Sequence, residues 1–159
     1  MAPCCVRHCA RGKSCMSDPE VLKVLGRWLE YAEDDLQAAQ ILLEQGGVPR
    51  TACFHAQQAA EKSLKATFVF LQVDFPFTHD LDRLRDLLPE GWAVKEDFPD
   101  LAGLSKWAVE PRYPGEVIEA TREDAVSAIN QAKEIFETTV TDLKSHGYPP
   151  DDSETTEDV

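Results

Sequence analysis

The amino-acid sequence predicts an all-α protein, an up-and-down antiparallel bundle of three long helices and two short ones. Apolar residues recur every three or four positions through three long stretches of the chain, which is the spacing of one face of an α-helix. Glycine and proline clusters separate these stretches and are typical of helix ends. No stretch alternates apolar and polar residues as a half-buried strand would, so we do not expect a β-sheet.

The first long helix is predicted over residues 19–45. Ser17 and Glu20 have the spacing of a capping box, and Pro19 between them suits a first helical turn. The glycine pair at 46–47 interrupts the pattern and should end the helix. Its inward stripe comprises Val21, Leu25, Trp28, Leu29, Ala32, Leu36, Ala39 and Leu43.

The second long helix is predicted over residues 49–72, and the short turn before it should return it antiparallel to the first. When this stretch is wound at about 100° per residue, small and apolar residues gather on one side and polar residues on the other. The apolar side comprises Ala52, Cys53, Ala56, Ala59, Ala60, Ser63, Leu64 and Leu71. The polar side comprises His55, Gln58, Glu61, Lys62 and Lys65.

Two short helices are predicted before the last long helix. Thr78 can cap the first of them, over residues 79–88. After an irregular segment over 92–98, Pro99 can open the other, whose inward stripe is Leu101, Leu104, Trp107 and Ala108. Two prolines exclude a regular helix in residues 110–115, which we expect to form a loop of fixed shape.

The last long helix is predicted to begin after Thr121 and to end near residues 146–147. Thr121 and Asp124 stand three residues apart, as in a capping box. The inward stripe comprises Ala125, Ala128, Ile129, Ala132, Ile135, Phe136, Thr139, Val140 and Leu143.

Length, composition and charge indicate one acidic globular domain. A chain of 159 residues is long enough to bury one core without disulfide support. We assign residues 17–147 to the bundle, residues 1–16 to a disordered N-terminal extension and residues 148–159 to an acidic disordered tail. The net charge of −13 repels nucleic acid at long range, so DNA binding is not expected.

The cysteines suggest neither secretion nor a zinc site. Four of the five lie in residues 1–15 without a Cys-x-x-Cys pair or an apolar signal-peptide core, and Cys53 fits a small core residue. Met16 precedes the first predicted cap and is a candidate natural start. No apolar run approaches the roughly 20 residues that span a bilayer. We therefore expect a cytoplasmic protein without membrane contact.

His55, Gln58, Lys62 and Lys65 are candidate phosphate ligands. Ammonium groups on neighbouring helical turns can pair with anionic oxygens, and the imidazole and amide add directional hydrogen bonds. The alternative is a solvated helix face, on which Glu61 and Lys65 form an ordinary ion pair four residues apart. Periodicity alone favours the solvated face.

His79, Arg112 and Tyr113 complete the set of candidate ligands. Thr78 and Asp80 beside His79 are explained as a helix start, whereas Arg112 and Tyr113 between prolines suit a nucleotide clamp by ion pairing and stacking. An arginine that covers the end of the bundle would have the same pattern. The histidines lack carboxylates at ligand spacing on their helix faces, so no metal site is expected. No catalytic residue and no cofactor are assigned, because no phosphate-binding or nucleophile motif is present.

Four segments, in this order, resemble the HEPN domain (higher eukaryotes and prokaryotes nucleotide-binding domain). They are AEDDLQAA at 32–39, CFHAQQAAEKSLK at 53–65, THDL at 78–81 and RYP at 112–114. The resemblance implies a dimeric helical bundle, often encoded beside a small nucleotidyltransferase and thought to bind nucleotide or substrate for it.

Some HEPN relatives are metal-independent ribonuclease toxins, in which an Arg is followed four to six residues later by His or, in some lineages, Tyr. Here Arg112 is followed at those positions by Glu116, Val117 and Ile118. The catalytic imidazole is missing at that spacing, so ribonuclease activity is not carried over from the resemblance.

We therefore expect a homodimeric nucleotide- or substrate-binding protein, the non-catalytic partner of a small nucleotidyltransferase in a module of the toxin–antitoxin kind. Its ligand would be a nucleotide or an RNA end. One alternative is a ribonuclease with displaced catalytic residues, in which His55 or His79 acts as general acid or base beside Arg112 and Lys62 or Lys65 stabilises the phosphate. The other is a dimeric scaffold without a ligand. The expected ligand-binding residues are His55, Gln58, Lys62, Lys65, His79, Arg112 and Tyr113.

Overall fold

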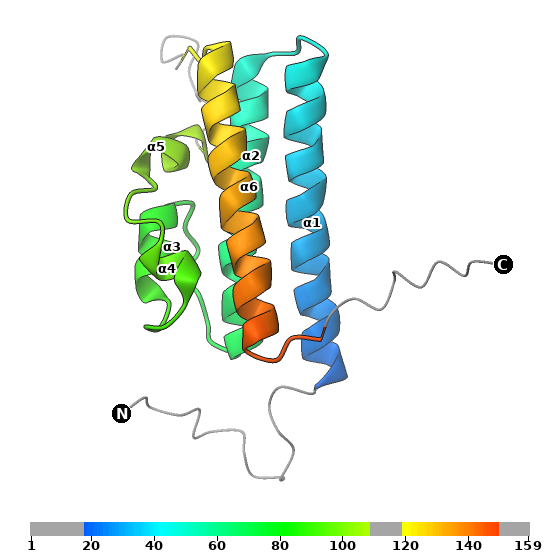
Figure 1. Ribbon diagram of the computed structural model, residues 1–159, viewed down its shortest axis with the longest axis vertical. Coiled ribbons are helices and arrows are strands. Elements are labelled where there is room, and N and C mark those ends of the chain that lie inside the picture. The colour runs from blue at the N-terminus through cyan, green and yellow to red at the C-terminus, as the bar shows by residue number, and fades with distance from the viewer. Residues whose placement is uncertain (1–17, 109–118, 150–159) are drawn as a thin grey trace, which may run out of the picture.

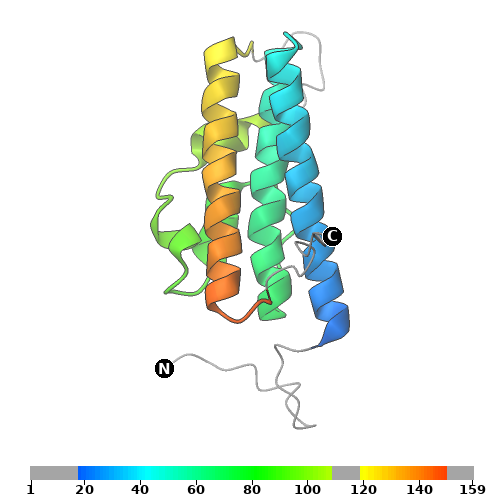
Figure 2. The same cartoon turned by 45° about the vertical axis from the view of Figure 1, so that its right-hand side comes forward.

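The computed structural model describes residues 18–108 and 119–149. Three long helices lie side by side, and the central one contacts both others (Figure 1 and Figure 2). Within the described residues there is no strand, and the predicted all-α helical bundle is confirmed. The long helices are α1 (Pro19–Glu44), the central α2 (Pro49–Leu71) and α6 (Arg122–Ser145).

A second layer of short elements packs against α2 and α6 on one side of the bundle (Figure 1). The chain between the second and third long helices builds this layer. Its elements are α3 (Leu81–Leu87), α4 (Ala93–Glu96), α5 (Ala102–Ser105) and the 3-10 turn η2 (Lys106–Ala108).

The first helix begins and ends close to its predicted limits. Asp18 caps α1, because its carboxylate accepts a hydrogen bond from the backbone N–H of Glu20 (3.0 Å). The predicted cap, Ser17, lies outside the described residues. At the other end Gly46 has a φ of +70°, which only a residue without a Cβ adopts freely.

The direction of the last helix follows from its end contacts. The Arg122 guanidinium donates to the backbone oxygen of Leu43 (2.8 Å), so α6 begins beside the end of α1. The Tyr148 hydroxyl lies at Gly26, near the start of α1. Helix α6 is therefore antiparallel to α1 and parallel to α2, because the short elements carry the chain back along the bundle (Figure 1). Packing continues to Tyr148, one residue past the expected boundary of the bundle.

The small-residue face of α2 lies in the core as predicted. Its alanines, Cys53, Ser63 and Leu64 are fully buried, and only Leu71 at the end remains half-buried. Small side chains let α1 and α6 approach closely on both sides of this helix. Burial, with a smaller contribution from the charge of Asp124, raises the pKa of the Cys53 thiol to about 11, so this cysteine is a packing residue and a poor nucleophile.

The short helices differ from the prediction. Thr78 does not cap α3; its hydroxyl accepts from the backbone N–H of Asp80 (3.2 Å), and the Asp80 carboxylate caps the helix through the backbone N–H of Arg83 (3.1 Å). A turn of helix, α4, lies in the segment expected to be irregular. The last short helix begins at Ala102 rather than at Pro99. These elements are too short to be specified by periodicity.

The predicted capping box of the last helix is confirmed. The Thr121 hydroxyl accepts from the backbone N–H of Asp124 (3.1 Å), and the Asp124 carboxylate accepts from the backbone N–H of Thr121 (2.9 Å). Hydrogen bonds donated to the Asp124 carboxylate by the backbone N–H and the hydroxyl of Thr121 lower the pKa of that carboxyl below its ordinary value.

Several predicted features lie outside the described residues. They are the extension at 1–16, the loop at 110–115 and the tail from residue 150 onward. None of the helices in the described part of the chain has the length and hydropathy needed to cross a membrane.

Candidate functional site

Two carboxylates organise the polar face of α2. Asp35 reaches this face from α1, and Glu61 belongs to α2 itself. Each carboxylate binds one lysine and one histidine. We call these groups the Asp35 cluster (Asp35, His55 and Lys62) and the Glu61 cluster (Glu61, Gln57, Lys65 and His79).

The Asp35 cluster joins the first two helices. One carboxylate oxygen of Asp35 accepts from Nδ1 of His55 (2.8 Å), and the other accepts from Nζ of Lys62. Because α1 and α2 form an antiparallel pair, a residue about ten positions before the turn lies level with one about ten positions after it. The short turn therefore places Asp35 between His55 and Lys62, which stand two helical turns apart on one face of α2.

The Glu61 cluster is more deeply buried. Lys65 Nζ lies 2.6 Å from one Glu61 oxygen, and Gln57 Nε2 and His79 Nδ1 each lie 3.0 Å from the other. The Glu61 and Lys65 side chains are only 6% and 9% exposed. Burial alone would raise the pKa of the Glu61 carboxyl, but hydrogen bonds from Lys65, Gln57 and His79 outweigh it and lower that pKa. Glu61 is therefore an ionised, buried anchor.

Gln57 connects α2 to the segment before α3. Its amide nitrogen donates to Glu61 and also to the backbone oxygen of His79 (3.3 Å). Its amide oxygen accepts from Nε2 of Gln58 (2.8 Å). Since Gln57 is fully buried, these hydrogen bonds fix the position of His79 relative to the helix.

The polar face is neither a solvated surface nor a row of free cations. The predicted ion pair between Glu61 and Lys65 is present. Both side chains are buried, so the expectation that this pair lies on a solvated helix face is wrong. Lys65 Nζ also lies 5.6 Å from the centre of the Phe75 ring, so Lys65 is enclosed and acts as a positioning residue. The described side chains of this face that reach solvent are those of His55, Gln58, Lys62 and His79.

The accessible groups have a fixed orientation. Lys62 is a donor, whereas His55 and His79 donate through Nε2 only when the imidazole is protonated. A carboxylate only accepts hydrogen bonds, so Nδ1 of both histidines carries a proton and Nε2 is directed away from the carboxylate. Lys62 has three N–H donors, and Asp35 binds through one oxygen. The remaining donors of a side chain that is 26% exposed can contact an anionic oxygen without loss of the Asp35 pair.

The structure brings together five of the seven predicted ligands. His55, Gln58, Lys62, Lys65 and His79 all lie on or beside the polar face of α2, whereas Arg112 and Tyr113 lie outside the described residues.

Sequence reasoning missed the contributions of Asp35 and Gln57. Asp35 could have been found from the sequence, because the antiparallel register of the first two helices places it level with the polar face of α2. The role of Gln57 could not, because its hydrogen bonds depend on where the fold places His79.

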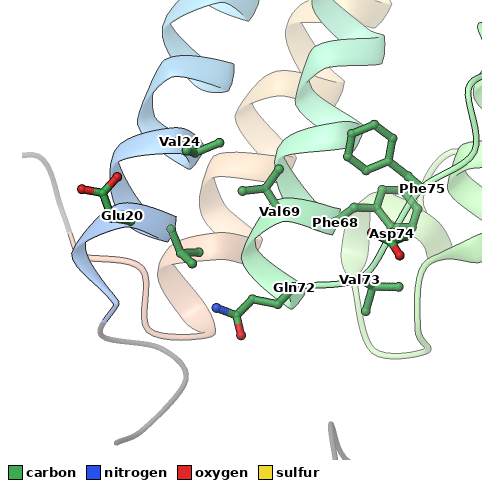
Figure 3. A pocket seen from close by; sticks show the side chains of 9 residues that line it. Glu20, Val24, Phe68, Val69, Gln72, Val73, Asp74 and Phe75 are labelled. Carbon is green, nitrogen blue, oxygen red and sulfur yellow. The ribbon is translucent and has the colours of Figure 1, made fainter. Parts of the chain in front are cut away.

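A separate groove lies between the start of α1 and the end of α2. It has a volume of about 510 Å³ and is apolar along much of its wall, with carboxylates of Glu20 and Asp74 among its lining groups (Figure 3). Among the described residues, no basic side chain lines it. Within the described residues no group of three or more His, Cys, Asp or Glu side chains could hold a metal ion.

Fold and site together define a small helical-bundle protein whose central helix carries a buried network of carboxylates, lysines and histidines. The family model of the HEPN domain matches residues 25–143. The chain therefore belongs to the HEPN domain family.

Two solved structures are similar to this chain. TT1696 from Thermus thermophilus is 32% identical with a TM-score of 0.65, and the match covers 75% of this chain and 98% of that one. ST0689, an archaeal HEPN homologue, is 27% identical with a TM-score of 0.58, and the match covers 74% of this chain and 95% of the other. The comparison with curated proteins gave no match.

Proposed function

We propose that the protein binds a nucleotide or an RNA end on the polar face of α2, as the non-catalytic, homodimeric partner of a small nucleotidyltransferase. The observation that carries the proposal is that three accessible side chains, the ammonium of Lys62 and the imidazoles of His55 and His79, are held in place by the carboxylates of Asp35 and Glu61. Lys62 donates to an anion, and each imidazole also donates through Nε2 when it is protonated. Donors that are already oriented lose little entropy when they bind a ligand. Charge-assisted hydrogen bonds from such groups suit phosphate oxygens.

The carboxylates limit how strongly the face attracts anions. Each lysine charge is balanced by one carboxylate, so the two clusters of a single chain have a modest excess of positive charge only when their histidines are protonated. A second copy of the chain beside the first would double the number of donors around one ligand. Homodimerisation is therefore part of the proposal, and sedimentation equilibrium with and without ATP tests it.

Lys62→Ala tests ligand binding, because Lys62 is the accessible lysine of the two clusters. Loss of a charge-assisted hydrogen bond, about 1.5–3 kcal/mol, should weaken ATP binding by about tenfold or more, measured by calorimetric titration. Lys133→Ala is the matched control, since Lys133 is an exposed lysine of α6 and its removal changes the net charge equally.

Two results would contradict this proposal. If Lys62→Ala and Lys133→Ala bind ATP equally well, the polar face of α2 is not the site. If the wild-type chain binds no nucleoside triphosphate, the alternative of a dimeric scaffold without a ligand is favoured.

A ribonuclease is the second candidate function, and one observation favours it. Both His55 and His79 are oriented through Nδ1 by a carboxylate, which is an arrangement that supports general acid–base catalysis. Cleavage of single-stranded RNA by the purified chain, abolished in His55→Ala or His79→Ala, would support this function. RNA that stays intact would exclude it.

A further inference from the structure

Phe77 has the most exposed large hydrophobic side chain in the described part of the protein. It is 100% exposed, whereas the other exposed large hydrophobic side chains retain 40–58% of their accessible surface. Isolated exposed apolar residues are common on protein surfaces, so exposure alone does not define a site. The surroundings of Phe77 supply the further observations.

The backbone that carries Phe77 is held on both sides. Phe75, two residues earlier, packs against the rings of Trp28 (6.0 Å between centroids) and Phe68 (5.8 Å). On the other side, the backbone oxygen and the imidazole of His79 are bound by Gln57 and Glu61. The Phe77 ring is thus presented to solvent from a segment fixed to the bundle.

Phe77 and His79 form a corner of two rings. Their centroids are 6.3 Å apart and their planes are inclined at 64°. Nδ1 of His79 is occupied by Glu61, which leaves Nε2 as the polar atom on the free edge of the imidazole. An apolar ring face beside a hydrogen-bonding edge is complementary to a flat heterocycle.

The corner is linked to α2 through the His79–Glu61 contact, one residue before the accessible Lys62. His79 is bound to Glu61, and Lys62 is the next residue of α2, about 100° further around the helix. A ligand with a ring on Phe77 and phosphates directed toward Lys62 would use both features.

We propose that Phe77 is the stacking platform for the base of the bound nucleotide, so the site binds base-bearing phosphates more tightly than inorganic phosphates. This inference rests on the proposed function. Stacking is tolerant of base identity, so the site should bind purine and pyrimidine nucleotides, or the unpaired end of an RNA, with little preference among bases. A protein partner is less well matched, because Thr78, His79 and Asp80 beside Phe77 are polar and the core of a protein interface is apolar.

Calorimetric titration of the full chain with ATP, UTP and inorganic tripolyphosphate tests the platform. Phe77→Ala and Phe77→Leu should weaken ATP and UTP binding at least about fivefold, within the range measured for lost base stacking. Phe77→Trp should retain it, because an aromatic face is still present. Tripolyphosphate should bind all four proteins equally. A fully exposed side chain makes little contribution to folding, so the thermal midpoints should agree.

Three results would overturn the platform. ATP binding that is equal in wild type and Phe77→Ala leaves nucleotide binding in place but removes the role of Phe77. Equal weakening of ATP and tripolyphosphate means that Phe77 shapes the site without recognising a base. Unchanged ATP binding with altered sedimentation of Phe77→Ala assigns the ring to a protein contact. If the wild type binds neither ATP nor tripolyphosphate, the proposed function itself fails.

Discussion

Glu61 shows how a single charged side chain can be stable inside a small bundle. An isolated buried carboxylate costs several kcal/mol. Here Lys65, Gln57 and His79 donate hydrogen bonds to it from two different segments of the chain. Glu61 therefore joins the middle of α2 to the segment before α3. Its negative charge also balances the buried ammonium of Lys65.

Glu61→Gln should change the pH dependence of stability. The pKa of Glu61 is lower in the folded chain than the value of about 4.3 expected in the unfolded one, so its charge stabilises the fold above that pH. This contribution is lost as the pH falls through the folded pKa. We expect the variant to be less stable than wild type by about 2–3 kcal/mol at pH 7, and the difference to shrink as the pH falls below about 4.

Urea unfolding at pH 7, 5 and 3 measures this difference. Glu33→Gln is the matched control, because Glu33 is exposed on α1 and loses the same charge. A difference between Glu61→Gln and wild type that does not vary with pH would show that Glu61 is not ionised in the folded protein.

The two faces of α2 show how one helix can serve both packing and binding. Its small residues face α1 and α6, and its polar residues meet Asp35 from α1 and His79 from the segment after α2. The Asp35 cluster and the Glu61 cluster each include a residue from outside α2, so both clusters depend on how this helix packs against its neighbours. Helix ends contribute to stability independently of this packing, through capping hydrogen bonds between residues close together in the sequence.

Thr121→Ala should destabilise the start of α6. The change removes the hydroxyl that accepts from the N–H of Asp124, at a cost of about 1 kcal/mol. For a domain of this size, the thermal midpoint should fall by about 2–4 °C, measured by circular dichroism.

Thr141→Ala provides the comparison, since Thr141 lies within the same helix and its hydroxyl bonds only to the backbone oxygen of Glu137. Equal midpoints for the two variants would indicate that the capping box contributes nothing to stability.

At the scale of the molecule, residues 18–108 and 119–149 form a three-helix core and a layer of short elements fixed to it by side-chain hydrogen bonds. Asp142 of α6 accepts from the buried N–H of Val94 in α4 (2.9 Å), and Ser105 accepts from the N–H of Leu81 (3.0 Å). The layer lies between α2 and α6 in sequence and returns the chain to the end of the bundle where α2 begins. By holding the layer against the core, these hydrogen bonds support the parallel arrangement of α2 and α6.

Asp142→Ala should loosen the layer. The N–H of Val94 would be left unpaired in the interior, which costs about 1–3 kcal/mol. We expect lower stability in guanidinium chloride and faster amide hydrogen exchange in α4, with the long helices less affected.

Glu137→Ala removes an exposed carboxylate from the same helix. Its ion pair with Lys133, at 3.8 Å, is on the surface and should contribute little. If the backbone amides of α4 exchange at the same rate in Asp142→Ala and Glu137→Ala, the Asp142 hydrogen bond does not hold the layer of short elements against α6.

Features that depend on residues close together in the sequence were predicted well, and features that depend on distant residues were not. The long helices agree to within a residue or so, because apolar periodicity and caps such as Thr121 with Asp124 act over a few residues. The short helices were partly wrong. Asp80, not Thr78, caps α3, and α4 depends on a hydrogen bond to Asp142, which is 48 residues away.

The sequence by itself determined the all-α class, the small-residue face of α2 and the presence of donors at His55 and Lys62. Only the tertiary structure decided that these donors are bound by Asp35, that Lys65 is buried with Glu61, and that Phe77 stands free beside His79. The physical reason is that these contacts join residues from different segments, as with Asp35 and Lys62, 27 positions apart. Helical periodicity orients a side chain around its own axis, but the docking of helices decides which charge it meets.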